Sequence, residues 1–172
     1  MPVSIAYLSL GSNLGDRGAN LRACIARLDK LGKVAKISSL YETEPMEFRE
    51  QPWFLNCVVE LETPLTAHQL LAEIEAIEEE LGRTREIHKG PRTIDIDIVL
   101  FGDSAIADKN LKIPHPAMSE RRFVLEPLAE IAPQAVHPVL RKSARELLAE
   151  LNQRVAGRSG STSPRIRHFS PG

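Results

Sequence analysis

Cysteine is scarce in this sequence, and an excess of charge of either sign is missing. Cys24 and Cys57 are the only two cysteines among 172 residues, and both sit in apolar patterns. They predict reduced core thiols of a cytoplasmic protein rather than a disulfide or a metal pair. The formal net charge is −1, which argues against a general basic surface for nucleic acid.

Long apolar runs are also missing. No stretch reaches the length that a membrane span needs, and the first ten residues suggest a short strand instead of a signal peptide. The hydrophobic content of 42% is nevertheless enough for a real core. We expect one domain over residues 1–156 and a flexible tail over 157–172, where Gly, Ser, Pro and Arg dominate. Balanced charge without a long exposed apolar stripe favours a monomer.

The hydrophobic periodicity predicts an alternation of strands and helices. Strands are expected over residues 3–10, 34–41 and 54–63, with a fourth inside residues 90–102. One helix follows Asp16 and ends at Gly32, and a second begins at Thr66 and ends near Gly82. The order β-α-β-β-α-β predicts an α+β fold of the ferredoxin-like class: a four-stranded antiparallel sheet with two helices on one face. The other face is then free to hold a ligand.

The region after Gly102 is expected to form C-terminal additions to that core. Prolines, including Pro127, are expected to break it into short pieces. A capping box of Ser143 and Glu146 predicts one last short helix.

Two carboxylates interrupt the fourth strand at alternate positions. Asp95 and Asp97 share one face because side chains alternate along a strand, and their Cα atoms are expected roughly 6.5 Å apart. The opposite face is the apolar row Ile94, Ile96, Ile98 and Leu100. Two like charges beside a core repel each other and lose hydration, and a divalent cation is the simplest group to offset that cost. The alternative is a solvated acidic pair at a strand edge.

A basic segment precedes this strand. It contains Arg83, Arg85, His88, Lys89 and Arg92. Hard oxygen ligands beside several cations suit Mg²⁺ together with a polyphosphate. A solvated surface loop would carry the same arginines.

Several short motifs, spread in order along the chain, resemble those of one enzyme family. They are Gly11-Ser12-Asn13, Tyr41-x-Thr43-x-Pro45, Gln51-Pro52-x-Phe54-Leu55-Asn56, Ile77-Glu78-x-x-x-Gly82-Arg83-x-Arg85, Gly90-Pro91-Arg92-Thr93-Ile94-Asp95-Ile96-Asp97, and Pro114-His115-Pro116-x-Met118 with Arg121-x-Phe123. The family is 6-hydroxymethyl-7,8-dihydropterin pyrophosphokinase, of folate biosynthesis. The resemblance implies an ATP-dependent diphosphotransferase that moves pyrophosphate to the pterin hydroxymethyl group and releases AMP.

The resemblance also implies roles for single residues in phosphate transfer. Asp95 and Asp97 would hold two Mg²⁺ ions that bridge the triphosphate and the acceptor oxygen. Arg83 and Arg92 would grip the transferring phosphates with planar guanidinium forks. The remaining ATP contacts are expected from Glu78, Arg85, Arg92, Ile98, His115 and Arg121.

The pterin needs a flat slot with a polar edge. By resemblance, Phe54 and Phe123 stack on the ring, and Asn56 offers its edge both a donor and an acceptor. Loop positions that match pterin contacts are Thr43, Glu44 and Met46. Taken alone, phenylalanines in such positions are more often plain core residues, whereas Asn56 is harder to explain in that way because it interrupts an apolar strand.

Two other functions fit the same order of elements. An RNA-recognition module needs aromatic and basic residues on its sheet, and this chain has two carboxylates there instead. A small-molecule binding module without catalysis would not need Asp95, Asp97 and Arg92 together. Among enzymes, the alternative is a phosphotransferase that acts on another small alcohol and releases ADP, and the fold does not separate these functions.

Overall fold

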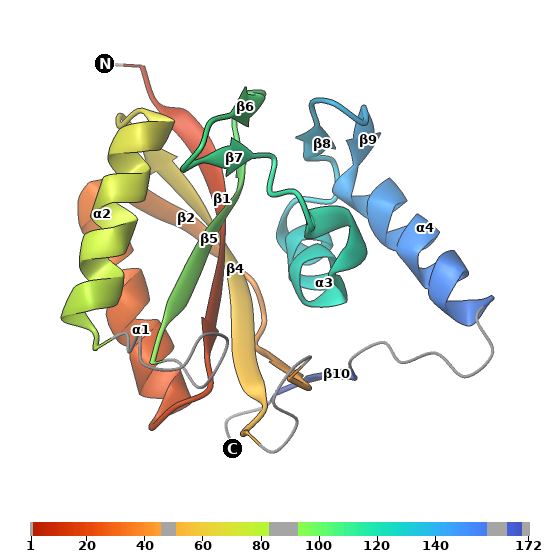
Figure 1. The fold of residues 1–172 in the computed structure, drawn as a ribbon, viewed down its shortest axis with the longest axis horizontal. Coiled ribbons are helices and arrows are strands. Elements are labelled where there is room, and N and C mark those ends of the chain that lie inside the picture. The colour runs from red at the N-terminus through yellow and green to blue at the C-terminus, as the bar shows by residue number, and fades with distance from the viewer. Residues whose placement is uncertain (1, 46–50, 83–92, 158–164, 170–172) are drawn as a thin grey trace.

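The computed structural model describes residues 2–45, 51–82, 93–157 and 165–169. Its centre is an antiparallel sheet with the order β10-β3-β4-β1-β5, in which β2 also pairs with β4 (Figure 1). The strands are β1 (Ser4–Ser12), β2 (Lys33–Ile37), β3 (Tyr41–Thr43), β4 (Phe54–Thr63), β5 (Asp95–Phe101) and β10 (Ile166–His168). The four predicted strands correspond to β1, to β2 with β3, to β4 and to β5, and across the sheet they lie in the order β5-β1-β4-β2. This is the ferredoxin-like order, so the predicted fold class is confirmed.

Two helices cover one face of the sheet. They are α1 (Arg17–Leu28), followed by a short 3₁₀ turn over Asp29–Leu31, and α2 (Ala67–Glu80) (Figure 1). The predicted caps are present: Asp16 accepts from the amide of Ala19, and Thr66 forms a capping box with Gln69. The main core lies between these helices and the strands and includes both cysteines. Burial raises the pKa of each thiol to about 12, so both stay protonated.

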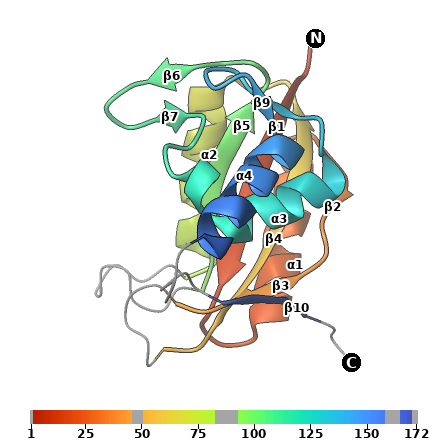
Figure 2. The same ribbon diagram turned by 90° about the vertical axis from the view of Figure 1, so that its right-hand side faces the viewer.

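The opposite face is only partly open, contrary to the sequence expectation. Two further helices lie over it, α3 (Arg122–Ile131) and α4 (Ala144–Ala156) (Figures 1 and 2). They bury a second apolar cluster against the sheet, which includes Val58, Val99 and Leu125. The segment from β5 to α3 contains β6 (Ile106–Ala107), β7 (Lys112–Ile113) and a 3₁₀ turn over Met118–Glu120. Between α3 and α4 lie β8 (Val136–His137) and β9 (Lys142–Ser143).

Pro127 lies inside α3 instead of ending a segment. A proline in a helix gives up one hydrogen bond and strains the preceding turn. Here Pro127 is itself buried, as are Leu125 and Leu128 of the same helix, and this burial offsets that loss. The predicted cap of α4 is present, because Ser143 and Glu146 form a capping box.

The predicted second strand is split into β2 and β3. Between them, the Ser38 hydroxyl accepts the hydrogen bond of the Val58 amide at 2.9 Å, and the Ser38 amide donates to the Val58 carbonyl at 2.9 Å. A side chain thus replaces one backbone partner of the ladder, which ends regular pairing at that point.

A β-bulge changes the predicted apolar row of the fourth strand. Leu8 of β1 pairs with Ile98, but Tyr7 pairs with Leu100, so Val99 is an extra residue. Leu100 therefore joins the second cluster, while Ile94, Ile96 and Ile98 stay in the main core.

The predicted flexible tail is interrupted by a strand. Residues 166–168 form β10 and pair with β3, at the lower end of the sheet (Figure 2). Helix α4 ends at Ala156 with Gly157 as its cap. Among the described residues, no helix is long and apolar enough to cross a membrane.

Candidate active site

One row across the sheet brings the two predicted halves of the site together. Asn56 of β4 pairs with Gly11 of β1, and Gly11 pairs with Asp95 of β5. Residues directly opposite each other in an antiparallel pair point to the same face. Since neighbouring strands lie about 4.8 Å apart, the backbones of Asn56 and Asp95 are separated by roughly 10 Å across Gly11.

Gly11 leaves this row without a side chain between the amide and the carboxylate. A Cβ at Gly11 would lie 2.8 Å from Oδ1 of Asn56 and 3.4 Å from the Phe54 ring. A methyl group cannot sit that close to an oxygen without displacing it. The glycine therefore allows the Asn56 amide and the Phe54 ring to lie over β1.

Asp95 and Asp97 lie on the face that carries Asn56. Both are half-buried, and Ile96 and Ile98 between and after them point into the main core. Asp97 pairs across the sheet with Ser9. The predicted shared face of the two carboxylates is therefore present in the structure. Ile98, an expected ATP contact, has its side chain on the opposite face.

Glu78 of α2 is used to hold β5. It is 4% exposed, and its Oε2 accepts the backbone amide of Ile96 at 3.0 Å. Because β5 ends the sheet, this amide has no strand partner on that side, and the carboxylate satisfies it. The contact of Glu78 with Ile96 therefore stabilises β5 next to the carboxylate pair. The expected contact of Glu78 with ATP stays a prediction.

His115 lies near the carboxylate pair. Its amide donates to Val99 of β5 at 3.0 Å, and its Nδ1 accepts from the amide of Ala117 at 3.1 Å. Burial and the neighbouring charge of Arg121 lower the pKa of His115, although Asp95 acts in the opposite direction. The imidazole is therefore neutral at pH 7 and carries its proton on Nε2.

Three of the predicted pterin residues, Thr43, Phe54 and Asn56, lie on β3 and β4, whereas Phe123 lies on α3. Thr43 pairs with Phe54, and the Nδ2 atom of Asn56 donates to Oγ1 of Thr43 at 2.7 Å. Thr43 and Asn56 are buried, while Phe54 is half-buried. Phe123 packs against the second apolar cluster, with the Arg121 guanidinium carbon 5.5 Å from its ring centroid. The structure thus places a fixed polar pair beside an aromatic ring.

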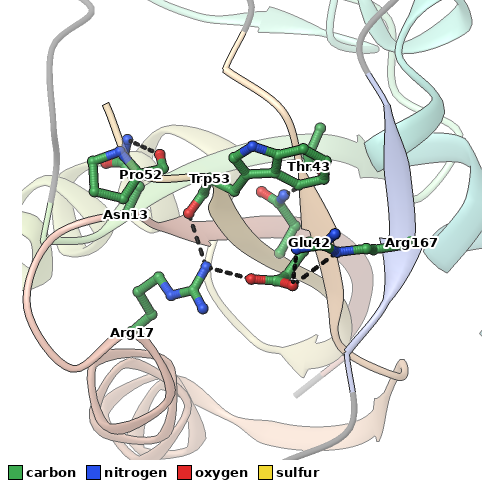
Figure 3. Close-up of polar contacts among 8 residues, drawn as sticks. Asn13, Arg17, Glu42, Thr43, Pro52, Trp53 and Arg167 are labelled. Carbon is green, nitrogen blue, oxygen red and sulfur yellow. Dashed lines mark hydrogen bonds and ion pairs between the residues drawn. The ribbon is translucent and has the colours of Figure 1, made fainter. Parts of the chain in front are cut away.

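The Gly11-Ser12-Asn13 motif and the motif that begins with Gln51-Pro52 are far apart in the sequence but contact each other in the structure. Nδ2 of Asn13 donates to Oε1 of Gln51 at 2.7 Å and to the Pro52 carbonyl at 3.2 Å. Arg17 donates to the carbonyl of Trp53 at 2.9 Å (Figure 3). These bonds hold the segment before β4 against the turn after β1. Sequence analysis missed them because partners 36 to 39 positions apart leave no local pattern.

Four of the predicted site residues lie outside the described residues: Arg83, Arg85, Arg92 and Met46. The described flanks of the arginine segment lie together, since Oγ1 of Thr93 donates to the Gly82 carbonyl at 3.4 Å. Within the described ranges, no three His, Cys, Asp or Glu side chains form a group that could hold a metal ion.

The fold defines an α+β protein of the ferredoxin-like class, and comparisons with known proteins give the family. A family model described as 7,8-dihydro-6-hydroxymethylpterin-pyrophosphokinase matches residues 7–133. The chain therefore belongs to the 7,8-dihydro-6-hydroxymethylpterin-pyrophosphokinase family, which confirms the resemblance seen in the motifs. Members are ATP-dependent diphosphokinases of folate biosynthesis, and this membership does not favour a non-catalytic binding module.

Curated relatives agree with this family. The chain is 50% identical over 133 residues to the 2-amino-4-hydroxy-6-hydroxymethyldihydropteridine pyrophosphokinase of Bacillus subtilis, which covers 76% of this chain and 80% of that protein. The enzyme of the same name from Aquifex aeolicus is 41% identical over 148 residues, with 86% and 92% covered. The folic acid synthesis protein fol1 of Schizosaccharomyces pombe is 44% identical over 149 residues.

The chain is shorter than some of these relatives. It spans only 20% of the length of the Schizosaccharomyces pombe protein, although the match covers 86% of this chain. A solved structure of Plasmodium falciparum HPPK-DHPS with pterin and p-hydroxybenzoate has a TM-score of 0.74 at 20% identity, covering 94% of this chain and 46% of that one. That likeness supports the fold.

Proposed function

We propose that this chain transfers pyrophosphate from ATP to the hydroxymethyl group of 6-hydroxymethyl-7,8-dihydropterin and releases AMP. The observation that carries the proposal is the row Asn56–Gly11–Asp95, which sets a group suited to a pterin edge beside a group suited to a metal-bound phosphate. A transfer reaction needs both substrates held in line at short range, and a gap of roughly 10 Å without an intervening side chain allows that.

The carboxylate pair fits Mg²⁺ by its donor chemistry. Asp95 and Asp97 provide hard oxygen donors on one face, half-exposed and two positions apart. Magnesium keeps several waters and typically takes only one or two carboxylates together with substrate phosphates, so a third acidic ligand is not required. When bound, two such ions would neutralise phosphate charge and lower the pKa of the acceptor hydroxyl. Asp95 and Asp97 would hold them, and Glu78 would keep β5 in place beneath.

The other residues would bind and orient the substrates. Asn56, oriented by Thr43, would hydrogen-bond the pterin edge, and Phe54 and Phe123 would stack on its ring. Neutral His115, with its proton on Nε2, would donate to an ATP oxygen, close to Arg121. Arg83, Arg85 and Arg92 would bind phosphate, and Glu44 and Met46 would complete the pterin contacts. We further propose that the chain acts in the cytoplasm as a monomer, without nucleic acid or membrane.

The nucleotide product tests the reaction. The protein is mixed with ATP, Mg²⁺ and 6-hydroxymethyl-7,8-dihydropterin, and the nucleotides are separated by chromatography. AMP that forms only when pterin and metal are both present supports pyrophosphate transfer. ADP would indicate transfer of a single phosphate, and bound pterin without any turnover would indicate a binding protein.

A substitution in the pair tests the metal assignment. In Asp97→Ala we expect almost complete loss of AMP formation with an unchanged melting temperature, since the side chain is half-buried and outside both apolar clusters. Asp103→Ala is the matched control, because Asp103 is an exposed carboxylate just beyond the same strand. Near-normal turnover in Asp97→Ala would refute the assignment, as would equal losses in both variants.

A further inference from the structure

Residues 165–169, here called the C-terminal clasp, close the sheet beside the candidate pterin site. Ile166–His168 pair with all three residues of β3, and the clasp adds backbone bonds at both ends. The Glu44 amide donates to the Arg165 carbonyl at 2.8 Å, and the Phe169 amide donates to the Leu40 carbonyl at 2.8 Å. Strand β3, which carries Thr43, therefore has a hydrogen-bonded neighbour on both sides.

Two arginines of the clasp pair with two glutamates on the β3 segment. Arg167 contacts Oε1 of Glu42 at 3.0 Å through both Nε and a terminal nitrogen. Arg165 contacts Oε2 of Glu44 at 2.9 and 2.8 Å in the same manner. Charged hydrogen bonds of this kind fix geometry as well as adding attraction. Since Glu44 is an expected pterin contact, the clasp holds that position directly.

Both arginines also lie over the side chain of Trp53. The guanidinium carbon of Arg167 is 4.3 Å from a Trp53 ring centroid, and that of Arg165 is 5.1 Å away. Trp53 immediately precedes Phe54 on β4. Figure 3 shows Glu42 reached by Arg17 on one side and Arg167 on the other, with the indole beside them. The clasp therefore ties β3 to the residue next to the predicted stacking ring.

Glu42 is ionised in this arrangement. Burial alone would raise its pKa, but the hydrogen bonds and charges of Arg17 and Arg167 outweigh burial and lower the pKa overall. The Arg17–Glu42 distance is 2.9 Å, and Arg17 also bonds the Trp53 carbonyl. One carboxylate thus links α1, β3, β10 and the start of β4.

The clasp lies beyond the part of the chain that defines the family. The family model ends at residue 133, 32 positions before Arg165. A role for residues 165–169 is therefore not contained in the family assignment, and it has to be argued from the contacts made by this chain.

We propose that Arg165 and Arg167 are positioning residues for pterin, acting through Glu44 and Trp53. The proposal rests on the proposed function, because it takes Thr43, Glu44 and Phe54 as the pterin contacts. Without the two guanidinium groups, the clasp loses its ties to Glu42, Glu44 and the indole. The β3 end and the Trp53 segment then move more freely, and pterin has to order them on binding. ATP binds elsewhere on the sheet, so its affinity is unaffected.

The test is the double variant Arg165→Gln/Arg167→Gln in the full chain. We expect the KM for pterin to rise about fivefold, the sum of several weak exposed contacts, with kcat and the KM for ATP changed by less than about twofold. Arg145→Gln, at an exposed arginine on α4, is the matched control. The conservative variant Arg165→Lys/Arg167→Lys keeps the charge but loses the planar forks, and it should recover part of the pterin affinity.

A second measurement does not depend on turnover. Trp53 is the only tryptophan, so tryptophan fluorescence, excited where tyrosine does not absorb, reports on this site alone. We expect acrylamide to quench Trp53 more strongly in the glutamine double variant than in the unaltered chain or in Arg145→Gln. Pterin affinity without ATP, measured by equilibrium dialysis, should fall in parallel.

The outcomes separate the two proposals. If the unaltered chain forms AMP but the double variant keeps the pterin KM and the Trp53 quenching of the unaltered chain, the clasp proposal is wrong and the proposed function stands. Equal increases in the KM values for ATP and pterin would indicate a general structural role and would also overturn it. If the unaltered chain neither binds pterin nor forms AMP, the proposed function fails, and the clasp proposal falls with it.

Discussion

Adding one methyl group at Gly11 should weaken pterin binding through Asn56. In Gly11→Ala the new Cβ would start 2.8 Å from Oδ1 of Asn56, which is the end of a side chain and is therefore the atom that gives way. An outward shift of about 0.5 Å restores ordinary contact. That shift strains the 2.7 Å bond from Asn56 to Thr43, and both groups are buried.

The cost can be estimated from that hydrogen bond. Losing a buried side-chain pair and leaving its partners poorly satisfied costs about 1–2 kcal/mol of unfolding free energy. If Asn56 also loses its aim at the pterin edge, the pterin KM should rise about tenfold, which corresponds to about 1.4 kcal/mol. The KM for ATP should stay unchanged, because the three atoms nearest the new methyl belong to Asn56 and Phe54 and none belongs to Asp95. Urea unfolding and steady-state kinetics measure these quantities.

A double-mutant cycle tests whether the methyl group at Gly11 acts through the Asn56 side chain. In Asn56→Ala the amide is already gone, so adding Gly11→Ala should cost little further stability or pterin affinity. If Gly11→Ala has the same effect in both backgrounds, the methyl acts through the backbone or Phe54, and the reasoning fails. An unchanged pterin KM in the single variant would refute it more simply.

Two further predictions concern the fold outside the candidate site. Gly32→Ala should lower the unfolding free energy by more than about 3 kcal/mol, because a Cβ at Gly32 would fall on the backbone of Glu62. Gly15→Ala is the control and should cost only about 1 kcal/mol, because φ is +69° there but nothing lies within 4 Å of the new Cβ. Similar losses of unfolding free energy for the two variants in urea titrations would contradict the predicted clash. Glu130 has a lowered pKa because hydrogen bonds, led by that from the Tyr41 hydroxyl, outweigh its burial. Its stabilisation is therefore present above its ordinary pKa of 4.5 and is lost as the pH falls through the lower folded value. Glu130→Gln should flatten the decline of the urea midpoint in this acid range, and an unchanged decline would argue against the pairing.

Local patterns in the sequence were enough to predict much of the fold. The predicted third strand over residues 54–63 is β4 with the same bounds, and the capping residues Asp16, Thr66 and Ser143 all act as predicted. Each of these features depends on residues within a few positions of one another, because alternation and capping are short-range effects. The shared face of Asp95 and Asp97 follows from the same alternation.

Features that depend on distant partners were not predictable. Ser38 ends β2 because Val58, twenty positions away, bonds to its hydroxyl. Pro127 is tolerated in α3 because tertiary burial outweighs its helix-breaking tendency. The strand in the predicted tail pairs with β3, and its Arg167 bonds Glu42, 125 positions earlier in the chain. Composition alone predicts a flexible tail there, because segments rich in Gly, Ser, Pro and Arg bury little apolar surface. Composition does not show that a distant strand binds the segment.

The candidate site lies on the part of one sheet face that the C-terminal helices leave uncovered. Along β5, Asp95 and Asp97 are half-buried, and Val99 next to them is buried in the second apolar cluster. Burial increases in the same way along β4, where Phe54 is half-buried and Val58 is buried in the second apolar cluster. Carboxylates under that cluster would lose their hydration at a cost of several kcal/mol each unless a neighbour bonded to them, as the Tyr7 hydroxyl does to buried Glu60. The half-buried pair instead lies where α3 and α4 end. The helices added after the ferredoxin-like core thus set the limit of the polar site.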